Sequence, residues 1–192
     1  MGKCFKQLIN NILQGVRSDV LPKLKGKRKI IFFDLADPSR LSPPNFSELL
    51  SIISGYQEYG DVILGINLNE AQQVYKVLFG NDPKEDSVEA MTKAIYEKMK
   101  IDQLLVHPME YTVLASPNGL TRLSCKIETE RKIQTGAGDN LNAGFCLGRV
   151  LGFNEEQCLV TAMAGAGSYI SLGRSPGTTD LISNLKVWLN EQ

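Results

Sequence analysis

The stretch Thr135-Gly136-Ala137-Gly138-Asp139-Asn140-Leu141-Asn142-Ala143-Gly144 decides how this chain is interpreted. Its first two glycines, separated by one alanine, let the backbone approach a bulky anion, because no side chain larger than a methyl group intervenes. Apolar residues then recur at helical spacing up to Gly152, which predicts a helix that begins near Asp139. The first amides of a helix lack internal partners and carry the positive end of its dipole. The stretch is therefore a candidate phosphate site.

The string T-G-A-G-D-N-x-N-A-G-F resembles the second signature of the ribokinase-like (PfkB) carbohydrate kinases, whose core is G-A-G-D followed by A-G-F. The resemblance implies that Asp139 is the catalytic base, which accepts the proton of a sugar hydroxyl. It also implies that Gly136, Ala137 and Gly138 form the anion hole for the transferring phosphoryl group. The structural alternative is an aspartate favoured by the helix dipole after a tight Gly-Ala-Gly turn.

The resemblance implies a carbohydrate kinase that transfers a phosphoryl group from ATP to a sugar hydroxyl, with Mg²⁺ as a cofactor. It implies a ribokinase-like three-layer α/β/α fold with a mainly parallel sheet. The similarity spans about residues 28–192, which correspond to the carboxy-terminal, nucleotide and catalytic-base half of the family. We therefore expect one domain over residues 1–192, incomplete relative to the full family fold, and one interpretation is a truncated form of the kinase. The alternative is a non-catalytic phosphate-binding, nucleotide-binding or assembly module derived from that fold.

Short apolar runs alternate with helical patterns along the chain, which independently favours an α/β fold with right-handed crossovers. The run over residues 29–35 indicates a buried strand that ends at Asp34. Asn45 and Glu48 have the spacing of a capping box at the start of a helix. Further strands are expected over residues 61–66 and 103–106, and a hairpin over 111–114 and 120–123. Further helices are expected over residues 5–20, 70–79 and 88–99, over the signature helix, over a helix rich in small residues, and over a last amphipathic helix.

Asn67 and Glu70 follow the second expected strand and match an N-x-x-E motif that the family carries near phosphate and magnesium. The resemblance implies that these two residues hold the metal through water, with no direct protein ligand. The equally weighted alternative is a capping box, because an asparagine at a helix start with a glutamate three residues later caps a helix.

Two arginines are weaker candidates for contact with a phosphate. Arg40 ends an F-D-x-x-D-P-S-R run that contains Asp34 and Asp37 and is similar to the F-D-x-N-x-R stretch of fructokinase-like relatives. Arg174 lies in a glycine-containing loop before the last helix. A solvated loop charge is the favoured interpretation of Arg40.

The chain also departs from the family pattern near the signature. Ile133 and Gln134 replace the usual Asp-Thr, whose aspartate contributes to a monovalent-cation site in several members. The sequence from His107 to Thr112 replaces the usual T-x-G-x-x-G loop against the nucleotide. His107 is the only histidine and has no nucleophile or metal-ligand partner in sequence, so we expect a structural role at a strand end.

Composition limits the partners. Lysine plus arginine equals aspartate plus glutamate at 21 each, so no global charge favours nucleic acid or an anionic membrane, and we expect neither as a partner. Four scattered cysteines, Cys4, Cys125, Cys146 and Cys158, suit a reducing, cytoplasmic location. Because an incomplete sheet leaves an unpaired edge, we expect a homo-oligomer, a separately made amino-terminal half, or a first helix that covers the edge.

Overall fold

The computed structural model describes residues 2–26, 28–83, 87–124 and 132–190, so Cys125 lies outside the described residues. The chain divides into two compact units, Met1–Val106 with Leu114–Leu120, and His107–Val113 with Thr121–Gln192. Strands β4 (Tyr111–Ser116) and β5 (Gly119–Ser124) contribute residues to both units. A single domain over the whole chain therefore stays a prediction.

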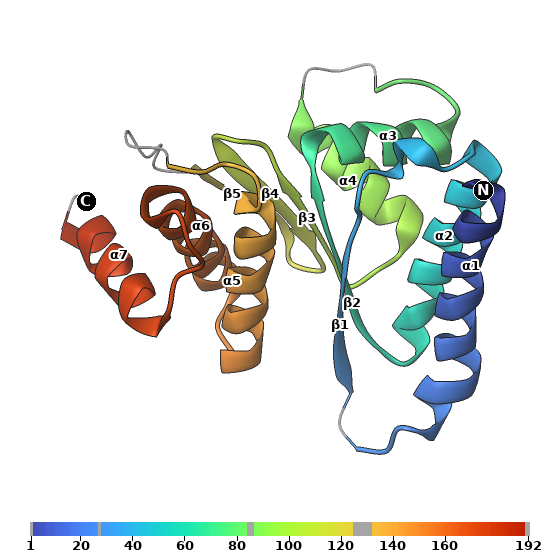
Figure 1. Ribbon diagram of the computed structural model, residues 1–192, viewed down its shortest axis with the longest axis horizontal. Helices are drawn as coiled ribbons and strands as arrows, with labels where there is room; N and C mark the ends of the chain where they lie inside the picture. Colours follow the sequence, from blue (N-terminus) through green and yellow to red (C-terminus); the bar gives the residue numbers. More distant parts are fainter. Residues whose placement is uncertain (1, 27, 84–86, 125–131, 191–192) are drawn as a thin grey trace. The chain divides into compact units, whose positions relative to one another are not determined.

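The described strands form one sheet in the order β1-β2-β3-β4-β5, in which β1 is Lys29–Asp34, β2 is Gly60–Asn67 and β3 is Gln103–His107 (Figure 1). Strands β1 and β2 are parallel, with Lys29 opposite Gly60 and Asp34 opposite Gly65. Only two residues connect the neighbouring strands β4 and β5, which makes them an antiparallel hairpin. Together with the helices between the strands, this mixed sheet confirms the expected α/β class.

Strand β1 is found where the sequence predicts it, but the expectation that it is buried is wrong. None of its six residues is buried, and Ile30 is 41% exposed. In β2, by contrast, six of eight residues are buried. The difference arises because β1 stands at one end of the described strand order and pairs with β2 alone, so a neighbouring strand shields only one of its sides.

The first helix, α1 (Gly2–Gly15), continues through a π-helical segment, η1 (Val16–Val20), and a 3₁₀ turn, η2 (Leu21–Lys23). It lies beside α2 (Pro43–Gly55) (Figure 1). The expected capping box of Asn45 and Glu48 is wrong, because α2 begins two residues earlier, at Pro43, after Ser42 as N-cap. Glu48 instead accepts a hydrogen bond from the buried Asn10 Nδ2 at 2.8 Å, which ties α1 to α2.

Two further helices complete the first unit. Helix α3 (Leu68–Phe79) ends at Gly80, whose φ of 77° is in the left-handed region, as the sequence predicts. Helix α4 (Val88–Met99) begins after Ser87, which accepts a hydrogen bond from the Ala90 amide. The short turns η3 (Pro38–Arg40) and η4 (Tyr56–Glu58) lie in the connections that follow β1 and α2.

Helices α5 (Ala137–Leu151), α6 (Glu155–Leu172) and α7 (Thr178–Asn190) belong to the second unit. Helices α5 and α6 lie side by side (Figure 1), and glycines set how closely they pack. A Cβ placed on Gly144 would lie 2.9 Å from the Ala162 Cα, and one on Gly165 would lie 2.6 Å from the Asn140 carbonyl oxygen. This contact fixes the position of α5, and with it the loop that precedes α5.

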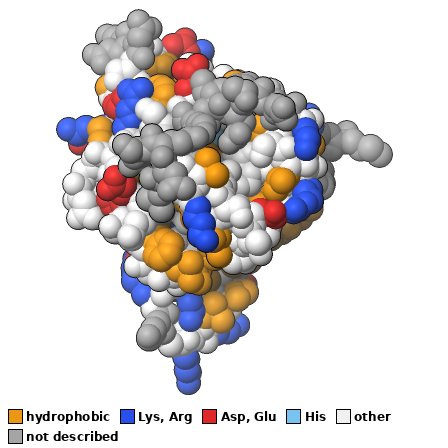
Figure 2. All heavy atoms as spheres, turned by 90° about the vertical axis from the view of Figure 1, so that its left-hand side faces the viewer, with side chains coloured by type: hydrophobic (Ala, Val, Ile, Leu, Met, Phe, Trp, Pro, Cys, Tyr) orange, Lys and Arg blue, Asp and Glu red, His pale blue; other side chains and the backbone are white. Residues whose placement is uncertain are grey.

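On the face shown in Figure 2, the described positive and negative side chains are interspersed with apolar ones. This distribution agrees with the equal numbers of basic and acidic residues in the sequence. Within the described part of the chain, no helix combines the length and the apolar character needed to cross a bilayer.

Candidate functional site

The signature loop enters α5 through a backbone conformation that only glycine adopts easily. Gly136 is the N-cap of α5 and has φ 94°, and no side chain caps the helix. Asp139 is the third residue of α5 and its side chain is exposed. The structure therefore presents the predicted base to solvent in the first turn of a helix, where the dipole favours a negative charge.

Tyr169 of α6 holds this loop from the other side. Its hydroxyl donates to the Thr135 carbonyl oxygen at 2.8 Å. A Cβ on Gly136 would lie 2.8 Å from the same hydroxyl, so a larger residue at Gly136 would push Tyr169 away. Sequence reasoning missed Tyr169, because a single tyrosine among small residues on a distant helix gives no local signal.

Some backbone amides of the loop donate to carbonyl oxygens nearby, and others have no partner within the helix. The Ala137 amide donates to the Gln134 carbonyl oxygen at 3.1 Å, and the Asn140 amide donates to the Gly136 carbonyl oxygen at 3.2 Å. The amides of Gly138 and Asp139 come between them, at helix positions that have no carbonyl one turn earlier within the helix. An anion at the start of α5 would therefore meet Gly138 and Asp139 first, and Ala137 only by sharing its hydrogen.

His107 ends β3 and lies against the same loop within the second unit. A Cβ on Gly138 would lie 3.2 Å from the His107 Cε1 and 4.0 Å from its Nε2, so this edge of the ring faces the loop. Burial lowers the pKa of His107 to about 4, and the nearby negative charge of Asp139 opposes that shift only partly. The imidazole is therefore neutral at neutral pH. Its expected structural role stays a prediction.

Asn67 and Glu70, in the first unit, form the capping box that the sequence offered as an alternative. The Asn67 side chain accepts from the Glu70 amide at 3.0 Å, and the Glu70 carboxylate accepts from the Asn67 amide at 2.9 Å. The box places both side chains at the carboxyl end of β2, where open α/β sheets bind ligands. A structural cap and a position near a ligand therefore coexist at these two residues.

The electrostatics around Glu70 fit a cation. Burial raises the pKa of Glu70, and the neighbouring negative charge of Asp34 raises it further, against backbone hydrogen bonds from Asn67 and Asp37. A bound cation would offset both effects, because it favours the ionised form of the Glu70 and Asp34 side chains. Among the described residues, no group of three potential metal ligands occurs. Mg²⁺ usually takes one or two carboxylates from a protein when it keeps most of its waters and binds phosphates, and Glu70 and Asp34 are two neighbouring carboxylates.

The two candidate arginines have local partners. Arg40 is 82% exposed and lies 3.4 Å from the Asp37 carboxylate. Arg174 donates to both carboxylate oxygens of Asp180, at 2.9 and 3.1 Å, beside the start of α7. A phosphate would have to compete with a bidentate carboxylate for Arg174.

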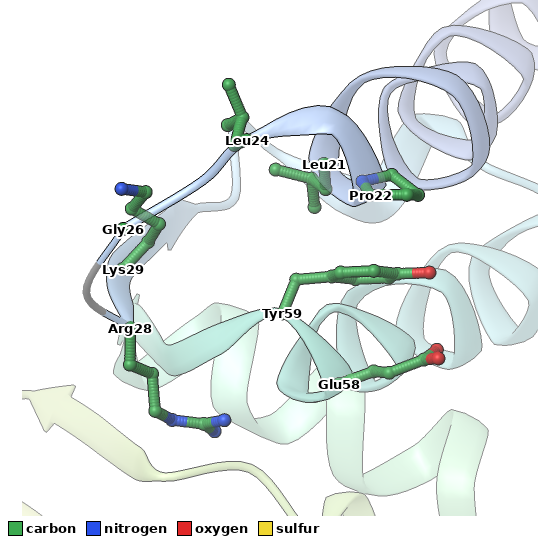
Figure 3. Close-up of a pocket in the computed structure, with 8 residues that line it drawn as sticks. All are labelled: Leu21, Pro22, Leu24, Gly26, Arg28, Lys29, Glu58 and Tyr59. Atoms are coloured by element: carbon green, nitrogen blue, oxygen red, sulfur yellow. The ribbon is translucent and has the colours of Figure 1, made fainter.

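A separate cavity of about 350 Å³ lies in the first unit, near the beginnings of β1 and β2 (Figure 3). Tyr59, Arg28 and Glu58 are among its lining residues. Arg28 already donates to the Gln57 and Gly60 carbonyl oxygens, both at 2.9 Å. The cavity contains none of the predicted site residues and lies at the amino-terminal ends of these strands, opposite the end that binds ligands in open sheets.

The family model and the curated relative that match this chain both carry the name ketohexokinase. A family model described as prokaryotic ketohexokinase matches residues 7–188. The ketohexokinase of Haloferax volcanii is 21% identical over 170 residues, which are 88% of this chain and 44% of that protein.

Two crystal structures have the same fold. The ribokinase of Thermotoga maritima has a TM-score of 0.67 at 19% identity, over 91% of this chain and 52% of that one. A putative ribokinase II of E. coli, solved with ATP and Mg²⁺, has a TM-score of 0.58 at 15% identity, over 75% of this chain and 44% of that one. The chain thus spans about half the length of the relatives that it matches.

Proposed function

Because this chain belongs to the prokaryotic ketohexokinase family, we propose that it is the phosphoryl-transfer part of a carbohydrate kinase of the PfkB type. The proposed reaction moves the γ-phosphoryl group of ATP to a hydroxyl of a ketohexose. The sugar class is taken from the name of the Haloferax volcanii relative, and the cofactors from the E. coli complex with ATP and Mg²⁺.

Asp139 is the proposed catalytic base. In the first step, its carboxylate accepts the proton of the sugar hydroxyl, and the hydroxyl oxygen attacks the γ-phosphorus. The bond from the γ-phosphorus to the bridging oxygen breaks, and ADP leaves with the electron pair. The observation that carries this proposal is the exposed Asp139 in the first turn of α5, directly after the left-handed Gly136.

The proposed anion hole is the loop from Gly136 to Gly138, with the amides of Gly138 and Asp139 as its principal donors. These amides are fixed before the reaction, because Tyr169 holds Thr135 and the α5–α6 contact holds Asn140. Donors that need no reorganisation stabilise developing negative charge most effectively.

Asn67 and Glu70 are the proposed Mg²⁺-associated residues, and they would act through water. When bound, Mg²⁺ neutralises charge on the nucleotide phosphates. The raised pKa of Glu70 beside Asp34 supports this proposal, because a nearby cation would stabilise both ionised carboxylates. Arg40 and Arg174 remain secondary proposals for phosphate contact, since both already have carboxylate partners.

The proposed partner is a second copy of the chain or a separately made amino-terminal half, which would add a strand to β1. Support comes from the position of β1 at one end of the described strands and from its exposed Ile30. We further propose a cytoplasmic location, in keeping with the free thiols of Cys146 and Cys158.

A coupled assay for ADP formation, run with a panel of ketohexoses, aldoses and nucleosides, tests the activity. We expect ketohexose-dependent ADP release that Asp139→Asn removes. A chain that binds ATP in calorimetry but releases no ADP with any acceptor would instead support the binding module, the alternative suggested by the sequence from His107 to Thr112 in place of the usual nucleotide loop. Undiminished turnover by Asp139→Asn would refute the assignment of the base.

A further inference from the structure

His107 lies in the proposed site without a role in the proposed reaction. It ends β3, and its Cε1–Nε2 edge faces Gly138, one residue before the proposed base. The loop that it faces is proposed to receive a phosphoryl group, so any ligand there would bring negative charge next to the imidazole. This inference therefore rests on the proposed function of the loop.

We propose that His107 takes up a proton when an anionic phosphoryl group occupies the loop at the start of α5. The imidazolium then supplies the loop with a full positive charge, and the ring returns to its neutral form when the anion leaves. His107 is in this respect a positioning residue, which acts on the ligand through charge, whereas Asp139 accepts the substrate proton.

The charges around His107 support this coupling. In the empty loop, burial dominates and keeps the pKa of His107 at about 4, even though Asp139 favours the protonated ring. Among the described residues, Asp139 is the charged group that acts on this ring electrostatically. Glu110, on the connection to β4, is exposed, and the Arg122 guanidinium lies 3.9 Å from the centre of the Tyr111 ring. A newly bound anion would therefore be the largest change in charge that the imidazole experiences.

The size of the effect follows from Coulomb's law. One negative charge about 5 Å from the ring, at an effective dielectric constant of about 20 to 40, raises the pKa of the imidazole by about one to two pH units. A doubly charged phosphoryl group acts in the same direction and more strongly. The pKa of His107 would thus move from about 4 toward the neutral range, so that binding near neutral pH takes up a fraction of a proton.

NMR can test this inference without assignment of the histidine resonance, because His107 is the only histidine in the chain. The ring Cε1–H shift is followed against pH with and without sulfate, a probe that remains a dianion throughout the titration. The Gly136 and Gly138 amide resonances report whether sulfate occupies the loop. We expect the midpoint of His107 to rise by at least one pH unit with sulfate, which corresponds to about a tenfold preference of sulfate for the protonated ring.

A second measurement uses His107→Gln, which retains a polar side chain but cannot titrate. The sulfate affinity of the natural chain should be several-fold higher at about pH 5 than at about pH 8, because the ligand-bound state holds the extra proton. His107→Gln should lose most of this dependence, whereas Asp139→Asn should keep it. If His107→Gln does not fold, the NMR titration of the natural chain still decides the question.

The outcomes separate the two proposals. If sulfate shifts the Gly136 and Gly138 amides but leaves the His107 midpoint unchanged, the coupling is refuted and the anion loop stands. If sulfate shifts neither the amide resonances nor the midpoint of His107, the loop is not an anion site, and both the proposed anion hole and this inference are refuted. A raised midpoint together with shifted amides supports both.

Discussion

The substitution Gly144→Ala tests the packing that positions the signature loop. The added Cβ would contact the Thr161 carbonyl oxygen of α6 and would lie 2.9 Å from the Ala162 Cα. Both neighbours are backbone atoms, so no side-chain rotation can relieve the contact. Because carbon atoms pack favourably at about 3.5–4.0 Å, α5 and α6 must separate by roughly 0.5–1 Å at this point.

The expected magnitude is the difference of two opposing effects. Overpacking of a close contact costs about 1–3 kcal/mol, and we expect the upper part of this range because the obstruction is backbone. Alanine in a helix interior gains about 1 kcal/mol over glycine. The net loss in the free energy of unfolding should therefore be about 1–2 kcal/mol. Ala143→Gly, at the neighbouring exposed position, should cost about 1 kcal/mol and calibrates the helix effect within α5.

Urea unfolding followed by tryptophan fluorescence is a suitable assay, because the single tryptophan, Trp188, belongs to α7 in the second unit. Equal slopes of the transitions are required before the free energies are compared. The costs of Gly144→Ala and Ala143→Gly should sum to about 2–3 kcal/mol, which is the cost of the overpacking. If that sum were near zero, the close approach of α5 to α6 would be refuted, together with the explanation of how the loop is held.

Substitutions at three other positions test the sites separately. Asp139→Asn should lower kcat by about 10²–10⁴-fold with little change in ATP affinity, as measured by coupled assay and calorimetry; an unchanged kcat would exclude Asp139 as the base. Glu70→Gln retains a capping-box acceptor and Glu70→Ala does not, so only Glu70→Ala should lose about 1 kcal/mol in thermal melts at neutral pH. Because burial and the charge of Asp34 hold the pKa of Glu70 above its usual value, folding stability falls as pH rises from that usual value through the folded-state pKa, where the buried side chain becomes ionised. Melting temperatures of Glu70→Gln should lack that decline, and an identical pH profile would contradict the assignment. Tyr169→Phe removes the hydrogen bond to Thr135 and should cost about 1 kcal/mol, with faster amide exchange in the loop; unchanged exchange would show that Tyr169 does not hold it.

Local sequence signals predicted most of the elements of this fold. The glycines after α3 and α5 mark helix ends correctly, because each has the left-handed φ that favours glycine. The capping box, one of two interpretations of Asn67 and Glu70, could be predicted because its two hydrogen bonds depend on residues three apart. The same spacing misled at Asn45 and Glu48, since Pro43 starts α2 earlier and the distant Asn10 provides a partner for Glu48.

Properties that depend on contacts between distant segments could not be predicted in this way. The apolar sequence of β1 indicates a strand, but its exposure depends on how many strands flank it. Similarly, the sequence contains no direct sign that His107 would lie against Gly138, because 29 residues lie between the end of β3 and the start of α5. The position of His107 at the end of a strand was the one available signal.

The signature string meets two physical requirements: its first half suits the proposed chemistry, and its second half provides the packing between α5 and α6. Gly136 and Asp139 suit the proposed chemistry, because one allows the left-handed entry and the other presents a carboxylate to solvent. Gly144 and Phe145 serve packing: the glycine lets α6 approach, and the phenylalanine is fully buried. A phosphate loop held only by its own turn would shift under the charge of its ligand. The A-G-F part therefore determines how rigidly the G-A-G-D part is held, and Gly144→Ala should impair the loop although it leaves every proposed chemical group in place.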